Sequence, residues 1–147
     1  MPEALTYELQ PRPEDLAAAR HALRGWMTVS GVSSPSSDDL VAVASEFLLQ
    51  AIAKAETSAT IVLRAERAPE GVAISVVVAT EAATGAGTAV TEVSGGGVVR
   101  PIRPLLAASD PLAPGGLGRR IVDAVCDDYE LDAVEGRLTL RCWHSAS

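Results

Sequence analysis

The stretch SEFLLQAIAKA, residues 45–55, decides the fold and raises the first question about function. Its apolar residues continue a stripe that begins at Leu40 and Ala44, with the spacing of an amphipathic α-helix that packs on a core. Projection onto a helix places Glu46 and Gln50 four residues apart on the shoulder of that stripe. The stretch therefore predicts a helix that covers a sheet and carries two polar side chains where it leaves the sheet.

Two interpretations of this polar pair remain open. A carboxylate at Glu46 can take a proton from a hydroxyl, and an amide at Gln50 can hold a metal-bound phosphate through its oxygen. Alternatively, both are ordinary rim residues, and Lys54 continues an i, i+4 series of side-chain contacts. On the evidence of this helix alone, the rim interpretation is the better supported.

The chain ahead of this helix predicts one strand and one more helix. Residues 5–9 alternate as a short strand. Residues 13–15, Pro-Glu-Asp, suit the first turn of a helix, where proline loses no hydrogen bond and acids favour the positive end of the dipole. Residues 30–37 are predicted as a loop, and Ser36 with Asp39 resembles a capping box. The apolar face of the first helix is predicted to be Leu16, Ala19, Leu23, Trp26 and Met27.

The chain after this helix predicts a hairpin and then a long irregular segment. Residues 60–65 and 72–79 are apolar strands, and the intervening ERAPEG, residues 66–71, is a turn. Residues 81–113 are rich in Gly, Ala, Thr and Pro. Segments of this length inside a compact domain are often lids or binding loops, or are disordered.

A third helix and a second hairpin complete the prediction. The helix begins near Gly116, with Leu117, Ile121, Val122 and Val125 facing inward. Residues 129–134 and 138–143 form the hairpin, with its turn at Glu135 and Gly136. The element order predicts one domain over residues 1–147. Its fold class is α+β, a two-layer sandwich with a mostly antiparallel sheet and three helices on one face.

Composition narrows the classes of partner. The chain has 147 residues, 48% of them hydrophobic, which is enough for one well-filled core. Its net charge of -7 argues against nucleic acid or an anionic membrane as partner, because proteins bind those surfaces through clustered Lys and Arg. No run approaches the apolar length of a membrane helix, and the first residues lack the pattern of a secretion signal. We expect a cytoplasmic protein that binds another protein or a small ligand.

The cysteines and histidines offer little chemistry. Cys126 and Cys142 form no CxxC motif, so we expect two inert core thiols rather than a disulfide or a metal site. Cys142 and His144 alternate onto one face of the last strand, but two ligands do not make a metal site. His21 is expected to be solvated or to cap a helix.

The stretch GGLG, residues 115–118, stands directly before the third helix. Glycines at a helix start let backbone N–H groups approach a phosphate, and the helix dipole favours anions there. A tight turn into the helix explains the same residues equally well. Conventional phosphate loops are excluded, because Lys54 is the only lysine and no GxGxxG follows a strand.

The chain order and these motifs resemble the histidine-kinase-like ATP-binding family, also called GHKL or Bergerat-fold, over nearly the whole chain. The closest likeness is to its anti-sigma-factor serine-kinase branch. The N box of that family runs Glu, three residues, Asn, Ala. SEFLLQA supplies Glu46 and Ala51, and has Gln50 in place of the Asn. The resemblance implies ATP and Mg²⁺ as cofactors, Glu46 as catalytic base and Gln50 at the Mg²⁺-binding position.

The other two boxes are kept to different degrees. The family's G1 box ends a strand with Asp-x-Gly and reads adenine through its Asp, whereas Thr80 and Ala82 occupy those positions here. The G2 box is matched by PGGLGRRIVDAVCDDYEL, residues 114–131, although Arg119 replaces a usual Leu. The resemblance implies nucleotide binding by Gly115, Gly116 and Gly118, with Thr80 at the adenine position.

These departures predict weakened nucleotide binding. Glutamine carries one more methylene than asparagine, so its oxygen would overshoot an octahedral Mg²⁺ site. Loss of the adenine-reading carboxylate removes a charged hydrogen bond worth about 1.5 to 3 kcal/mol.

Three functions stay open at this point. The resemblance implies a bacterial transcription regulator that holds a sigma factor, usually as a dimer, and phosphorylates a serine of an antagonist protein with ATP. A second hypothesis is a protein-binding module on the same fold that binds no nucleotide. The third is an unrelated α+β domain whose long loop covers a different small ligand.

Overall fold

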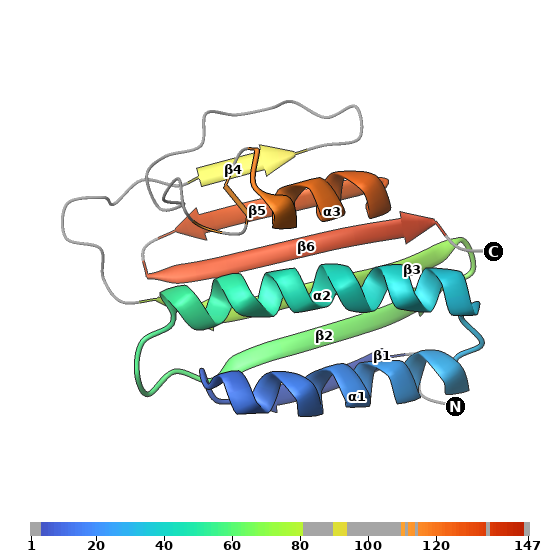
Figure 1. Cartoon of the computed structure of the whole chain (residues 1–147), viewed down its shortest axis with the longest axis horizontal. Coiled ribbons are helices and arrows are strands. Elements are labelled where there is room, and N and C mark those ends of the chain that lie inside the picture. Colours follow the sequence, from blue (N-terminus) through green and yellow to red (C-terminus); the bar gives the residue numbers. More distant parts are fainter. Residues whose placement is uncertain are drawn as a thin grey trace.

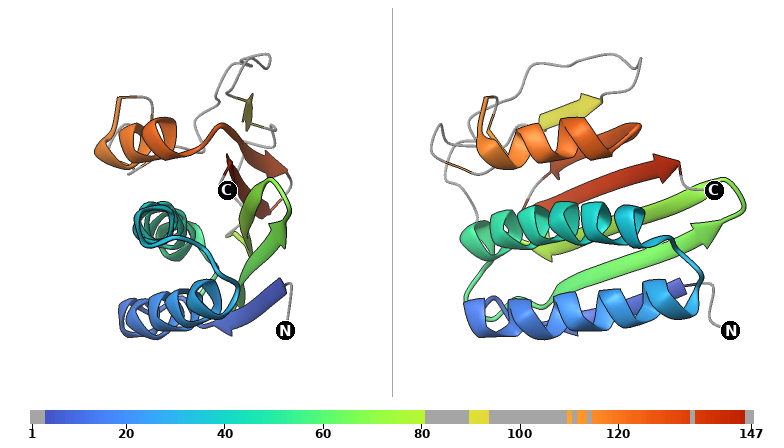
Figure 2. Two further views of the ribbon diagram at one scale, coloured as in Figure 1. Left: turned by 90° about the vertical axis from the view of Figure 1, so that its right-hand side faces the viewer. Right: turned by 45° about the vertical axis from the view of Figure 1, so that its right-hand side comes forward.

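The computed structural model describes residues 4–80, 90–93, 110, 112–113, 115–134 and 136–145. These residues form two layers, with a sheet on one side and three helices on the other (Figures 1 and 2). The predicted α+β sandwich is therefore confirmed. In chain order the elements are β1 (Ala4–Leu9), α1 (Pro13–Val29), α2 (Ser34–Lys54), β2 (Ile61–Ala68), β3 (Gly71–Ala79), β4 (Val90–Val93), α3 (Leu117–Val125), β5 (Asp128–Val134) and β6 (Arg137–Ser145).

The described strands form one sheet in the order β1-β2-β3-β6-β5-β4, and every neighbouring pair is antiparallel. Both predicted hairpins, β2–β3 and β5–β6, are confirmed. Between them, β6 pairs along the whole of β3. The strand latest in the chain thus joins the two hairpins into a continuous sheet.

The strand β4 was not expected. It pairs with β5, with Val90 opposite Ala133, inside the segment 81–113 that the sequence predicts as irregular. The surrounding Gly- and Thr-rich sequence lacks the apolar alternation that marks a strand. The prediction of a lid over 81–113 otherwise falls outside the described residues, apart from 110, 112 and 113.

The helix α1 begins and packs as predicted. Its N-cap is Arg12, with Pro13 in the first turn followed by Glu14 and Asp15. All five residues of the expected apolar face are buried against the sheet and α2. Helical spacing of large apolar side chains was sufficient to identify this element and its orientation.

The helix α2 lies in the middle of the helical layer and contacts α1, α3 and three strands. Its N-cap is Ser33, so it begins earlier than the predicted capping box at Ser36 and Asp39. That prediction was wrong: among the described residues no side chain caps this end of α2, and the Ser36 hydroxyl lies 3.2 Å from Nε2 of His144. The apolar stripe is buried as expected at Leu40, Ala44, Phe47, Leu48 and Ala51.

The inward face of α3 differs from the prediction. Leu117 is 77% exposed, whereas Arg119 is 4% exposed. Val122 is buried, and Ile121 and Val125 are half-buried against the core. The helix starts at Leu117, and Gly118 and Arg119 of its first turn are buried, with Arg119 against Tyr129 of β5.

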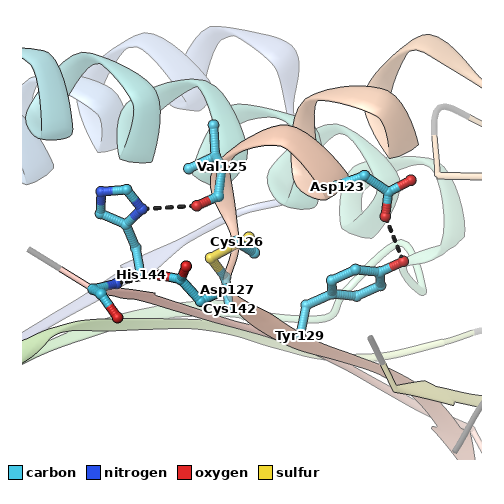
Figure 3. The surroundings of a disulfide bond; sticks show 8 residues. Asp123, Val125, Cys126, Asp127, Tyr129, Cys142 and His144 are labelled. Atoms are coloured by element: carbon cyan, nitrogen blue, oxygen red, sulfur yellow. Dashed lines mark hydrogen bonds between the residues drawn. A yellow bond between two sulfur atoms is a disulfide. The ribbon is translucent and has the colours of Figure 1, made fainter. Parts of the chain in front are cut away.

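The cysteines are also not as predicted. Cys126, the residue after α3, forms a disulfide with Cys142 of β6, their Cα atoms 5.7 Å apart (Figure 3). The hairpin register explains the pairing: Tyr129 lies opposite Cys142, so the residues leading into β5 approach the same part of β6. His144 lies with Nδ1 2.7 Å from the Val125 carbonyl oxygen, rather than acting with Cys142 toward a metal.

The position of His21 agrees with the sequence, since it is exposed on α1. Of the helices that the structure describes, none has both the length and the apolar content needed to cross a membrane.

Candidate functional site

The segment that leads into α3 is attached to the C-terminal half of α2. The backbone N–H of Leu112 donates to Oε1 of Gln50 at 3.4 Å, and Nζ of Lys54 lies 3.0 Å from Oδ2 of Asp110. Leu112 and Ala113 are both buried. These contacts bring the start of α3 next to the polar side chains of α2.

Gln50 is not a rim residue. Its side chain is completely buried, and its Nε2 atom has no hydrogen-bond partner within the described part of the chain. Lys54 turns to Asp110 instead of continuing a series with Gln50. The rim interpretation is therefore wrong for Gln50, because the segment before α3 covers the helix surface that the sequence pattern assigns to solvent.

Glu46 lies one helical turn before Gln50 and remains half-buried. Burial raises the pKa of its carboxyl group above the ordinary value of 4.5. Partial desolvation disfavours the charged form, so the carboxylate accepts a proton more readily than an exposed glutamate does. Glu46 is thus a half-buried carboxylate with a raised pKa, one helical turn before the buried Gln50 of α2.

The start of α3 has the backbone features of an anion-binding helix terminus. Gly115 has φ of 81°, a conformation that favours glycine, and Gly116 is the N-cap in extended backbone. The first helical hydrogen bond there runs from Arg120 N–H to Gly116 O, so the earlier N–H groups of the helix have no intrahelical acceptor. Among the described residues no side chain caps them. Such a terminus binds phosphate or carboxylate groups.

Thr80 lies beside the C-terminal end of α2. It is buried, forms an isolated bridge with Ala55, and donates its backbone N–H to the Gly136 carbonyl at 2.7 Å. The structure thus gathers Thr80, the C-terminal half of α2 and the start of α3. Ala82 lies outside the described residues.

Arg119 is a residue of this region whose placement the sequence did not predict. Its guanidinium carbon lies 5.9 Å from the centre of the Tyr129 ring, and the Tyr129 hydroxyl donates to Oδ1 of Asp123 at 2.7 Å. A cation over an aromatic face is stabilised by the ring quadrupole. No pattern in the sequence indicated that Arg119 would be buried beside Tyr129.

The implied cofactors fit this site unequally. A nucleotide phosphate suits the uncapped start of α3. A magnesium ion at Gln50 does not fit, because that side chain is fully buried and its oxygen is engaged with Leu112, which leaves a donor nitrogen. In the part of the chain that is described, no group of three or more His, Cys, Asp or Glu gathers for a metal.

Comparison with known proteins agrees with this geometry. The family model described as histidine kinase-like ATPase domain matches residues 9–142, from the end of β1 into β6. No curated protein matches the chain. The matched span includes α2, the start of α3 and both hairpins, and proteins of this family generally bind ATP. The chain belongs to the histidine kinase-like ATPase domain family.

Proposed function

We propose that this chain is a regulatory domain of the anti-sigma-factor serine-kinase type. It binds a sigma factor or the antagonist protein of that factor, in the cytoplasm of a bacterium. It also binds ATP, with reduced affinity, between α2 and the start of α3. The observation that supports this function best is the attachment of the α3 segment to α2 through Gln50–Leu112 and Lys54–Asp110.

Each part of the site has a role in this proposal. The start of α3, opened by Gly115 and Gly116, binds the phosphates through backbone N–H groups. Gly118 is buried at the second position of the helix and allows close packing there. Bound ATP supplies the phosphoryl group. Glu46 accepts the proton of the attacking serine hydroxyl of the partner, for which its raised pKa suits it.

Two features account for the reduced affinity. At the position where the family reads adenine with a carboxylate, Thr80 offers only a buried hydroxyl, and its backbone N–H is bonded to Gly136. The amide oxygen of Gln50 is bonded within the protein. A nucleotide therefore gains fewer charged interactions than in a relative with both residues intact.

A second candidate is the binding module that uses no nucleotide. It is favoured by the internal hydrogen bond of Gln50, which occupies the N-box amide without a ligand. The third hypothesis, an unrelated ligand-binding fold, is overturned by the family match. Association as a dimer stays a prediction.

The proposal is tested by calorimetric titration of ATP with Mg²⁺ into three variants at Leu117. This side chain is exposed at the first position of α3, so its replacement leaves the core intact. Leu117→Glu places a negative charge at the phosphate site and is expected to weaken binding about tenfold. Leu117→Gln is the neutral control, and Leu117→Lys is expected to strengthen binding.

The outcomes separate the two candidates. Saturable binding that follows the charge at residue 117 supports the nucleotide site. Absence of any heat or thermal shift at millimolar ATP leaves the binding module. Glu46 is tested by mixing Glu46→Gln with ATP and the antagonist protein: undiminished serine phosphorylation would remove this residue from the role of base.

A further inference from the structure

The helix α3 is held to the molecule by little apolar burial. Within the described structure, α3 has nine residues and buries one large apolar side chain completely, Val122. By contrast, α1 buries five apolar side chains. A helix this short is marginal on its own, so its position depends on the contacts at its ends.

At the C-terminal end of α3, a group of such contacts joins the helix to β6 (Figure 3). The carbonyl of Val125 lies 2.7 Å from Nδ1 of His144. The backbone N–H of Asp127 donates to the Trp143 carbonyl at 2.9 Å, and the Asp127 carboxylate accepts from Ser145 N–H at 2.5 Å. The Cys126–Cys142 bond is the covalent member of this set.

We propose that the Cys126–Cys142 bond is a reversible redox switch that sets how firmly α3, and with it the open glycine turn at its start, is held on the sheet. Disulfides in cytosolic proteins are usually redox-sensing or catalytic, and the chain has two cysteines in all, so no other thiol of the chain competes for the pairing. The cytosolic location and the link to the glycine turn rest on the proposed function, whereas the link between the disulfide and α3 does not.

The chemistry is an exchange with a dithiol reductant. One thiolate of the reductant attacks Cys126, the more exposed partner at 7% against 3% for Cys142. The Cys126–Cys142 bond breaks, and Cys142 leaves as a thiolate that takes up a proton. The second thiolate of the reductant then displaces Cys126, so the protein gains two electrons and two protons and the reductant becomes a disulfide. Hydrogen peroxide reverses the change: it oxidises one thiol to a sulfenic acid with release of water, and the second thiol attacks that sulfur, which releases a second water and forms the disulfide.

Burial of both sulfurs ties this exchange to movement of α3. A reductant reaches the bond when the end of the helix parts from β6, so whatever holds α3 in place slows reduction. Coupling between two sites is reciprocal: if reduction weakens nucleotide binding, bound nucleotide must protect the disulfide to the same degree. The nucleotide site and the redox site are expected to influence each other in this way.

The first test is hydrogen exchange of the oxidised and dithiothreitol-reduced protein, with peptides over 117–125 compared with peptides over 13–29. Reduction is expected to speed exchange in α3 about tenfold and to leave α1 unchanged, because sub-global opening follows local stability. The variants Cys126→Ser and Cys142→Ser should match the reduced protein and show no response to dithiothreitol. Circular dichroism of the wild-type protein before and after reduction verifies that the fold persists.

The switch is overturned if α3 exchanges equally in both redox states, or if the bond can be reduced only when the whole protein unfolds. The second test measures the rate of reduction with and without ATP and Mg²⁺, with protection of about tenfold expected from typical coupling energies. If neither redox form binds ATP, the proposed nucleotide function fails, and the exchange experiment still decides the redox proposal.

Discussion

The buried side chain of Gln50 in α2 accepts a hydrogen bond from the backbone of Leu112, 62 residues further along the chain. This bond, 3.4 Å long, attaches the segment before α3 to the central helix. Gln50 therefore belongs to the core of this protein. Changes at Gln50 should affect folding and ligand binding by separable amounts.

Replacement of Gln50 by Met and by Ala separates shape from polarity. Gln50→Met keeps the volume, removes a buried amide nitrogen that has no partner in the described structure, and loses one long hydrogen bond. We expect the free energy of unfolding to change by less than about 1.5 kcal/mol. Gln50→Ala leaves a cavity and should cost about 2 to 4 kcal/mol. Urea denaturation measures both, and equal losses would contradict the packing role.

The ion pair between Lys54 and Asp110 should contribute measurably to stability. Its side chains are 25% and 12% exposed, in contrast to the surface pair Arg24–Asp38 at 53% and 68%. Asp110→Asn is expected to cost about 1 kcal/mol, because a partly buried cation loses its partner, while Asp38→Asn costs less than about 0.5 kcal/mol. A double-mutant cycle with Lys54→Met isolates the pairwise energy. A cost at Asp38 as large as that at Asp110 would refute this ranking.

The free energy of unfolding should change with pH as Glu46 titrates. Its pKa in the folded state is raised by burial, so folding favours the protonated form. The stability linked to this group is present below the ordinary pKa of 4.5 and is lost as pH rises through the folded-state value. Glu46→Gln should therefore be more stable than wild type at pH 7, with the difference disappearing in acid. Thermal unfolding between pH 3 and pH 8 measures it; wild-type superiority at pH 7 would contradict the assignment.

The titration of Asp127 should have the opposite sign. Its pKa is lowered, chiefly by the hydrogen bond from Ser145 N–H. The stability linked to this group is present above the ordinary value of 3.8 and is lost as pH falls through the folded-state value. Asp127→Asn should be less stable than wild type at neutral pH and equal to it in strong acid. Equal stability of Asp127→Asn and wild type at neutral pH would contradict this assignment.

Much of the fold could be predicted because its elements carry strong local patterns. The five inward residues of α1 repeat at helical spacing, and each predicted hairpin joins two apolar strands through a turn that holds Gly. The sequence also predicts that Glu46 and Gln50 lie on one helix and that the GGLG stretch leads into the next helix. For these features, local propensity and tertiary structure agree.

The features that could not be predicted depend on contacts between distant segments. Gln50 is buried beneath the segment that holds Leu112. The spacing of residues within α2 cannot predict this contact, because Leu112 is distant in the sequence. The disulfide depends on the register of β5 and β6. In α3 the predicted inward residues Ile121, Val122 and Val125 contact the core, but Leu117 is exposed, and Arg119 instead lies against Tyr129.

The central position of β6 has a consequence for how the molecule assembles. This strand is the latest described element, yet it pairs with β3 on one side and β5 on the other. A chain that stops before Arg137 therefore leaves two unconnected pieces of sheet, β1-β2-β3 and β4-β5, each with an unpaired edge liable to self-association. During synthesis the core cannot close until these final strand residues emerge, so productive collapse should be late and largely post-translational.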